Sequence, residues 1–221
     1  ADLPIKDTLE DALEIPVWLE NEANLSALAE KTFVENHKNL IHVSIHAGVG
    51  AGIILDHHLY TGLAGTAGEA GHMIVQPGGR SCPCGNHGCL EQYISEPAVL
   101  SRYRELSGRT TVSIDDLVWA YNQKETAALA VTDEFTTYLA CGINNLWNLF
   151  SPECIILNCQ LTAYLPQLLP EILQKLSPRF RATCHLKLST LQDTGVLLGA
   201  AKVCISKYLG TEKLYFSGLQ P

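Results

Sequence analysis

Three cysteines lie close together in a segment rich in glycine and proline, and cysteine is a common ligand of structural metal ions. Cys82, Cys84 and Cys89 fall within eight residues of one another. Zn²⁺ prefers four ligands in a tetrahedron, so three thiolates leave one position to fill. His72, ten residues before Cys82, and His87, inside the loop, are the candidates for the fourth ligand. Three unpaired cysteines or a local disulfide are the alternatives, because C-x-C-x4-C is a less specific spacing than paired C-x2-C.

Two glutamates flank this cysteine cluster. Glu69 and His72 end a glycine-rich stretch that begins at Gly62, and Glu91 comes two residues after Cys89. Carboxylates accept hydrogen bonds from hydroxyl groups, and the second ring nitrogen of a metal-bound histidine is free to meet a ligand. We therefore expect a polar pocket beside the metal. Solvated surface charge is the simpler explanation for either glutamate taken alone.

Polar residues also lie between a predicted strand and a predicted helix near the start of the chain. Residues 15–19 form a short β-prone run, and Asn21 and Glu22 follow it directly before a helical pattern over 24–33. In open α/β sheets, ligands bind at the carboxyl ends of strands, so this layout predicts a ligand site. A turn with Asn24 as the N-cap of the helix explains the same residues without a ligand.

Glycines recur at every second position after the next predicted strand. Gly48, Gly50 and Gly52 follow the run 40–46, in which apolar and polar residues alternate as in a half-buried strand. Glycines at such a strand end let the backbone approach a phosphate, which would make them nucleotide-binding residues. A glycine-rich turn that leads into a β-hairpin over 51–60 explains them equally well.

The rest of the chain alternates between strand and helix patterns, which predicts an α/β layered fold. Residues 62–88 are too irregular for regular structure, and such long loops are usually functional or cross-linked. The apolar pattern of 126–150 predicts a surface buried against a second subunit. The expected strands are 15–19, 40–46, 51–55, 59–60, 154–157 and 185–188, and the expected helices are 24–33, 89–94, 96–106, 113–121, 126–150, 165–176 and 195–208.

The composition is that of a globular protein of one or two domains. Of 221 residues, 47% are hydrophobic and 17% are charged. No apolar run reaches the roughly 18 residues of a membrane span, and the first residues do not resemble a secretory signal. The net charge of −8 argues against a nucleic-acid surface on this part of the chain. Five further cysteines are scattered through apolar sequence, which favours buried thiols in a reducing cytoplasm.

Taken together, these motifs resemble the ROK family of sugar kinases and sugar-responsive repressors. The resemblance runs from about Pro16 to Tyr208 and is specific in 62–91, where 67–72 and the cysteine loop follow the family signature. It implies an α/β, actin-like ATPase and ribonuclease-H-like fold of two lobes, of which this chain, as the rear portion of a longer protein, would hold mainly the second. The implied divisions are the end of the N-terminal lobe and the connection over 1–36, the C-terminal lobe over 37–208 with its zinc loop 72–91, and a tail over 209–221.

The resemblance also implies roles for individual residues. A structural Zn²⁺ would be bound by His72, Cys82, Cys84 and Cys89, which favours His72 over His87 as the fourth ligand. The hydroxyl groups of a monosaccharide would be held by Asn21, Glu22, Glu69, His72 and Glu91.

Three departures from the kinases of the family weaken ATP use more than sugar binding. The kinases carry an aspartate at the position of Glu22, as the base that deprotonates the attacking sugar hydroxyl, and a longer glutamate displaces that carboxylate. They carry Gly-Thr-Gly where this chain has Gly48-Val49-Gly50, and a glycine pair in the segment that here reads Leu157-Asn158-Cys159-Gln160. The Asp-x-Gly phosphate motif of the N-terminal lobe is also missing from this chain.

We therefore expect the effector-binding and oligomerisation part of a ROK transcriptional repressor of sugar catabolism genes, most like the xylose-repressor branch. Its partners would be a monosaccharide, a second copy of the chain in a homodimer or higher oligomer, and DNA reached only through a preceding winged helix-turn-helix domain. The runner-up is a glucokinase-like sugar kinase with Glu22 as catalytic base and with ATP and Mg²⁺ near Gly48, Gly50 and Gly52. A zinc-stapled interaction domain without a small ligand is the third reading.

Overall fold

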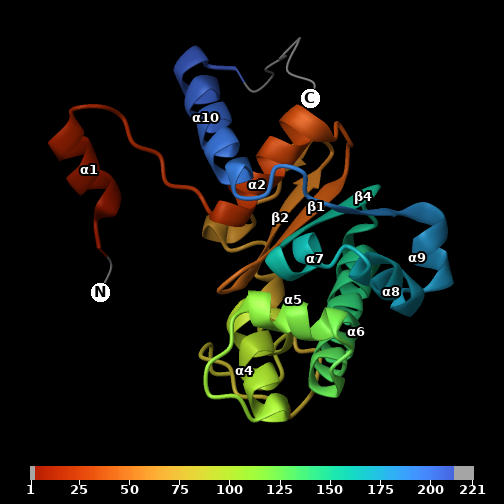
Figure 1. Cartoon of the computed structure of the whole chain (residues 1–221). Helices are drawn as coiled ribbons and strands as arrows, with labels where there is room; N and C mark the ends of the chain where they lie inside the picture. Colours follow the sequence, from red (N-terminus) through yellow and green to blue (C-terminus); the bar gives the residue numbers. More distant parts are fainter. Residues whose placement is uncertain (1–2, 212–221) are drawn as a thin grey trace.

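The protein consists of three layers, with a five-stranded sheet between two groups of helices (Figure 1). The computed structural model describes residues 3–211. The strand order is β3-β2-β1-β4-β5, in which β2 is antiparallel to β1 and β3, whereas β1, β4 and β5 are parallel. This mixed sheet between helices confirms the predicted α/β class. The strands are β1 Leu40–Ile45, β2 Val49–Leu55, β3 His58–Leu59, β4 Cys154–Cys159 and β5 His185–Leu188.

The central strand β1 is buried on both faces, so the prediction of a half-buried strand is wrong. All of its residues are buried. Ile41, Val43 and Ile45 pack into the larger hydrophobic core, while His42 and Ser44 point to the opposite face. Because helices cover that face as well, the polar residues of the alternating pattern are enclosed instead of solvated.

The larger core lies between the sheet and a layer of helices. The longest of them is α6, and its apolar side is buried in this chain's own core. The apolar pattern of α6 therefore gives no ground for a subunit interface, and the predicted homodimer stays a prediction. The helices of this layer are α3 Glu91–Ile94, α4 Glu96–Ser107, α5 Ile114–Asn122, α6 Thr126–Phe150, α7 Gln160–Tyr164, α8 Leu168–Lys175 and α9 Pro178–Thr183.

The other face of the sheet is covered by α2 (Glu22–Ala29), which a π-helical turn extends to Val34, and α10 (Thr194–Leu209) packs on α2. Glycines permit the close approach of these elements. A Cβ atom at Gly52 of β2 would lie 2.2 Å from the carbonyl oxygen of Ala23, and one at Gly199 of α10 would lie 2.0 Å from that of Leu25. α2 thus packs within the layered body, and the predicted division at residue 36 stays a prediction.

The first helix, α1 (Ile5–Leu13), stands apart from the layered body (Figure 1), and none of its residues is buried. The predicted strand over 15–19 is wrong, because residues 16–21 have no regular structure and pair with no strand of the described sheet. A β-prone run becomes a strand only where a partner offers hydrogen bonds. The sequence patterns also missed α1, α7 and α9, since short helices offer few periodic positions.

The remaining predicted helices and strands are confirmed within a few residues. Between β3 and α3 the chain forms two short 3-10 helices, η2 Leu63–Gly65 and η3 Ala70–His72, and is otherwise irregular, as predicted. Within residues 3–211, no helix is both long and apolar enough to cross a membrane. Most of the predicted tail, residues 212–221, lies outside the described residues.

Candidate metal centre and ligand site

The four residues predicted as metal ligands come together at one point. One ligand atom from each of His72, Cys82, Cys84 and Cys89 lies within 4.8 Å of all the others. His72 Nδ1 is 3.7 Å from Cys82 Sγ, and Cys84 Sγ is 3.7 Å from Cys89 Sγ. His87, the other candidate, is exposed and does not belong to this group.

These distances fit a tetrahedral zinc ion. Zn–S bonds of about 2.3 Å and Zn–N bonds of about 2.05 Å at tetrahedral angles put two sulfur atoms about 3.8 Å apart, and sulfur and nitrogen about 3.6 Å apart. Both separations of 3.7 Å agree with these values, and they are far longer than the S–S bond of a disulfide. Three thiolates and one imidazole also fill the coordination shell, which is typical of a structural site.

The thiols of Cys84 and Cys89 differ in their surroundings. A hydrogen bond with the backbone of Asn86 lowers the pKa of Cys84. Burial, followed by the neighbouring Cys82 and Cys84, raises the pKa of Cys89 to about 12. A thiol crowded in this way gives up its proton when a cation shares the negative charge, which again suits a metal.

The metal loop, residues 72–91, is folded around this cluster by hydrogen bonds between its two arms. Val75 N donates to Gly88 O at 2.9 Å, and Gly88 N donates to Arg80 O at 2.7 Å. A Cβ atom at Gly88 would lie 1.7 Å from the carbonyl oxygen of Gln76, so only glycine fits where the arms meet. The glycine content of this loop therefore follows from the close approach of its backbone segments.

Two of the predicted sugar-binding carboxylates lie beside the metal loop. Glu69 Oε2 is 4.0 Å from His72 Nε2, the ring nitrogen opposite the one in the cysteine cluster. Glu91 Oε2 accepts a hydrogen bond of 3.2 Å from Val49 N at the start of β2. A Cβ atom at Gly48 would lie 3.3 Å from the same carboxylate oxygen. One end of β2 is thus lined by a glutamate whose position the backbone fixes.

Asn21 and Glu22 lie at the start of α2, which packs on β2. Asn21 is the N-cap of α2, and its Oδ1 accepts a hydrogen bond of 2.8 Å from Ala23 N. Glu22 is the first residue of the helix and is exposed. A Cβ atom at Gly50 would lie 3.3 Å from Ala23 Cβ. An extended loop and a helix start therefore deliver these two side chains, in place of the predicted strand, and Asn24 is not the N-cap.

The first half of β2 is the meeting point of these segments. Ala51 N donates to Gly68 O at 2.8 Å, and a Cβ atom at Gly71 would lie 2.4 Å from Val49 O. The turn over 68–71, the metal loop and α2 all contact this short piece of strand. Each predicted sugar-binding residue consequently lies within two residues of a contact with β2 or its preceding turn.

The predicted nucleotide-binding glycines have another explanation in the structure. α2 covers Gly50 and Gly52, so helix packing accounts for both without a phosphate, and Gly48 is exposed. At the end of β4, Asn158 and Cys159 are 5% and 7% exposed, so their side chains fill the region that a glycine pair would leave open. Nucleotide binding at this chain stays a prediction.

The sequence patterns missed two groups that hold the site. Gln92 Nε2 donates to Cys82 Sγ at 3.6 Å, and Val49 N donates to Glu91. A backbone N–H group carries no sequence signal, because every residue except proline has one. Gln92 follows Glu91 directly, and its polar side chain is the only sequence feature that points to a contact with the cysteine cluster.

Comparison with known proteins tests the family resemblance that the motifs indicate. The sequence model of the ROK family matches residues 1–207. The chain belongs to the ROK family. A solved ROK family transcriptional regulator, described as a homologue of the E. coli MLC protein, matches with a TM-score of 0.73 and 30% identity over 89% of this chain and 55% of that one. ROK structures have the actin-like ATPase fold, so the fold expected from the motifs is confirmed.

Both branches of the ROK family occur among the relatives. The xylose repressor of Bacillus spizizenii is 34% identical over 219 residues, which cover 96% of this chain and 56% of the repressor. The glucokinase of Halalkalibacterium halodurans is 32% identical over 219 residues, which cover 90% of this chain and 66% of the kinase. The chain thus spans little more than half the length of the xylose repressor that it matches.

Proposed function

We propose that this chain is the effector-binding part of a ROK transcriptional repressor that responds to a monosaccharide. The observation that carries the proposal is a difference between the start of β2, where the predicted sugar-binding segments meet, and the end of β4, where the nucleotide would lie. Three segments that carry the polar residues, namely the start of α2, the 68–72 turn and Glu91, meet at the first half of β2. The end of β4, where the kinases of the family carry a glycine pair, is filled by Asn158 and Cys159.

The contacts orient the polar groups before a sugar arrives. Val49 N holds one oxygen of Glu91, so the direction of this carboxylate is set by the backbone of β2. A zinc ion on His72 Nδ1 would leave the proton on Nε2, which faces Glu69 at 4.0 Å. When bound, the zinc would cross-link the loop and fix this tautomer. Glu69 and Glu91 would then accept hydrogen bonds from sugar hydroxyls, beside Asn21 and Glu22.

The similarity to xylose repressors supports a pentose such as xylose as the effector. In the protein at its full natural length, DNA would be contacted by a part outside this chain, which agrees with the net charge of −8 found here. A second copy of the chain would be a further partner. A sugar that binds one arrangement of such a dimer more tightly shifts the population toward it and thereby changes the affinity for the operator.

Sugar binding to the full-length protein tests this function. We expect xylose at about a hundred times its dissociation constant to stabilise the protein by roughly 2.7 kcal/mol and to release it from its operator. Glu69→Gln and Glu91→Gln should each weaken sugar binding in calorimetry, whereas Glu105→Gln, an exposed carboxylate on α4, should not. If no pentose or hexose changes stability or operator binding, the domain is an interaction scaffold and the proposal fails.

Sugar kinase activity is the second candidate function, and the similarity to a glucokinase favours it. An assay that couples ADP release to a visible signal decides between the two. Sugar-dependent turnover of about 1 s⁻¹ or faster would establish a kinase. We expect none, and we expect none from Glu22→Asp either, since Asn158 and Cys159 would still fill the end of β4. A rise of about a hundredfold in Glu22→Asp would show that a displaced base is the only defect.

A further inference from the structure

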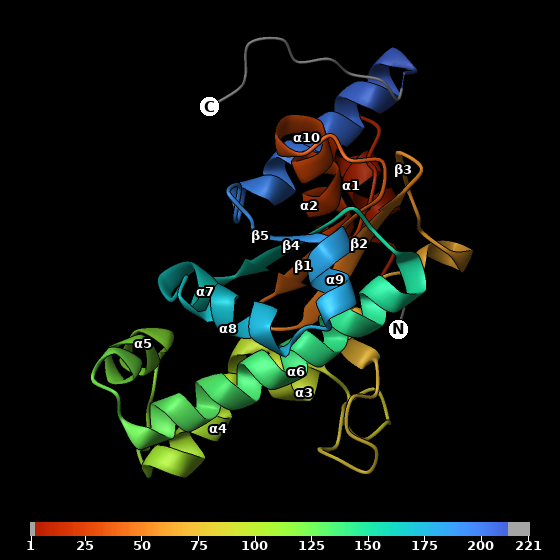
Figure 2. The same ribbon diagram turned by 90° about the vertical axis from the view of Figure 1, so that its right-hand side faces the viewer.

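One face of α6 contacts the metal loop and α3 at three successive turns of the helix. Glu134, Tyr138 and Gly142 follow one another at intervals of four residues, so they lie on one stripe of the helix surface. The residues that they meet, in the same order, are Arg80, Tyr93 and Leu90. Figure 2 shows α3 beneath α6 and the metal loop beside them.

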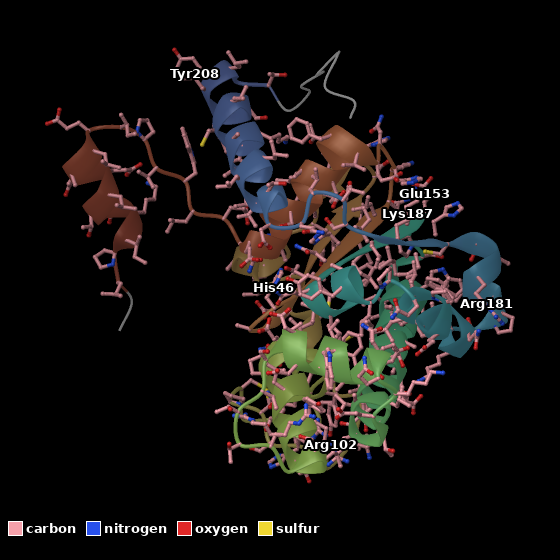
Figure 3. The ribbon with its side chains drawn as sticks, in the orientation of Figure 1. His46, Arg102, Glu153, Arg181, Lys187 and Tyr208 are labelled. Carbon is pink, nitrogen blue, oxygen red and sulfur yellow. The ribbon has the colours of Figure 1, made fainter. Side chains whose placement is uncertain are left out.

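Arg80 joins the metal loop to α6. Its guanidinium forms an ion pair with Glu134, and its Nη1 atom donates to the carbonyl oxygen of Gln92 at 2.8 Å. The guanidinium carbon also lies 4.5 Å from the ring centroid of Tyr93. Glu134 accepts a second hydrogen bond, of 3.1 Å, from Nε of Arg102 on α4. Figure 3 labels Arg102 near the lower end of the molecule. The carboxylate is therefore held between two arginines from different segments.

Tyr93 holds the backbone of the loop shortly before Cys82. Its hydroxyl accepts a hydrogen bond of 3.0 Å from Arg80 N. A Cβ atom at Gly79 would lie 2.1 Å from the same hydroxyl oxygen, so the phenol rests directly on the loop backbone. The ring of Tyr93 stacks on Tyr138 of α6 with centroids 4.0 Å apart. One side chain thus ties the loop backbone to the helix.

Leu90 and Gln92 are held by these contacts, and they lie on either side of Glu91, next to the predicted metal ligand Cys89. Leu90 packs on α6, where a Cβ atom at Gly142 would be 2.5 Å from Leu90 Cδ2. Gln92 donates to Cys82 Sγ at 3.6 Å, and its carbonyl is bound by Arg80. Glu91 stands between these two anchored residues, so the backbone position from which its carboxylate reaches Val49 N depends on where α6 holds them.

We propose that Arg80 and Tyr93 are positioning residues, through which α6 fixes both the metal-ligand loop and the Glu91 carboxylate. For the metal ligands this holds whatever the protein binds, whereas the role in sugar binding rests on the proposed function. The partners of metal ligands typically change metal affinity by about 10–100-fold when they are lost. We expect loss of the contacts made by Arg80 and Tyr93 to lower metal affinity within this range.

Two glutamates that contact the same arginine provide the test. Glu134 and Glu105 both bind Arg102, but only Glu134 also binds Arg80. In the full-length protein loaded with Co²⁺, whose thiolate absorption bands report the ligand geometry, we expect Glu134→Gln and Arg80→Met to release the metal to a chelator about tenfold faster or more. Glu105→Gln should leave the release rate within about twofold of the natural protein.

A conservative variant separates positioning from general destabilisation. Arg80→Lys keeps a charge beside Glu134 but lacks the planar fork that reaches Gln92 O at the same time, so it should restore the release rate only in part. Hydrogen exchange of the Arg80 and Gly88 amides in the metal-free protein provides a readout without metal or sugar. We expect faster exchange in Arg80→Met and Glu134→Gln than in Glu105→Gln.

The outcomes for positioning and for sugar binding are independent. If Glu134→Gln speeds metal release and amide exchange while no sugar binds even to the natural protein, positioning stands and the proposed function fails. If the natural protein binds sugar, and Glu134→Gln leaves metal release, amide exchange and sugar affinity equal to those of Glu105→Gln, the positioning role is overturned. The same outcomes decide for Arg80→Met, which removes the contacts with Glu134 and Gln92 by changing the residue on the metal loop.

Discussion

At the residue scale, the four predicted metal ligands differ in exposure, and this difference selects the substitution that tests the site. Cys82 and Cys89 are buried, whereas Cys84 is exposed, so Cys84→Ser changes one ligand with little effect on packing. We expect elemental analysis to find about one zinc per natural chain and clearly less in Cys84→Ser. His87→Ala, in the same loop but outside the cluster, should keep its metal. Equal metal content in both variants would contradict the proposed ligand set.

His42 is a second residue whose surroundings lead to a prediction. It lies in β1 beside Gly52 and Ile156, and its buried Nδ1 atom has no hydrogen-bond partner. Burial, together with the nearby His46, lowers the pKa of His42 from 6.5 to about 3. Between these values the unfolded chain binds a proton that the folded chain does not. This term therefore lowers stability as the pH falls below about 6.5, by at most about 1.4 kcal/mol per pH unit.

Replacement of His42 by leucine removes this term. The side chains on the same side of the sheet, such as Leu40 and Ile156, are apolar, so leucine suits the site. We expect His42→Leu to raise the free energy of unfolding by roughly 1 kcal/mol at pH 7, because an unpaired buried nitrogen is lost. The gain should grow between pH 6.5 and pH 5. Urea denaturation of both proteins at pH 6.5 and at pH 5 checks this. If the variant exceeds the natural protein in free energy of unfolding by the same amount at the two pH values, the lowered pKa of His42 is disproved.

At the element scale, the packing of α2 on β2 depends on Gly52 more than on Gly50. A Cβ atom would lie 2.2 Å from the Ala23 carbonyl oxygen at Gly52, but 3.3 Å from Ala23 Cβ at Gly50. We expect Gly52→Ala to force the helix away from the sheet and to cost about 1–3 kcal/mol of stability. Gly50→Ala, on the same face of the same strand, should cost clearly less. Equal urea midpoints for the two variants would show that α2 adjusts freely.

At the scale of the whole molecule, α1 contributes little to the stability of this chain. Its apolar residues Ile5, Leu9 and Leu13 remain 48%, 39% and 55% exposed. We expect deletion of residues 1–14 from the 221-residue chain to change the free energy of unfolding by less than about 1 kcal/mol. Leu28→Ala in the buried helix α2 should cost about 2–5 kcal/mol in the same measurement. A comparable loss from the deletion would show that α1 packs on the layered body.

The sequence by itself determined the α/β class, the strands from residue 40 onward, the long helix α6 and the cysteine cluster. These features depend on patterns within a short stretch of chain, such as the alternation of β1 or the spacing of Cys82, Cys84 and Cys89. The motif of the metal loop likewise indicated the ROK family, which the comparison with known proteins confirmed.

The resemblance to the ROK family already favoured His72 over His87, and the tertiary structure places His72 with the cysteines. Only the tertiary structure decided that β1 is buried on both faces and that residues 15–19 form no strand. It also revealed the network that links Arg80 and Tyr93 to α6. Each of these depends on contacts between segments far apart in the chain, such as Arg80 and Glu134, which are 54 residues apart. Such contacts leave no local periodic pattern, because either residue alone would suit a solvated surface equally well.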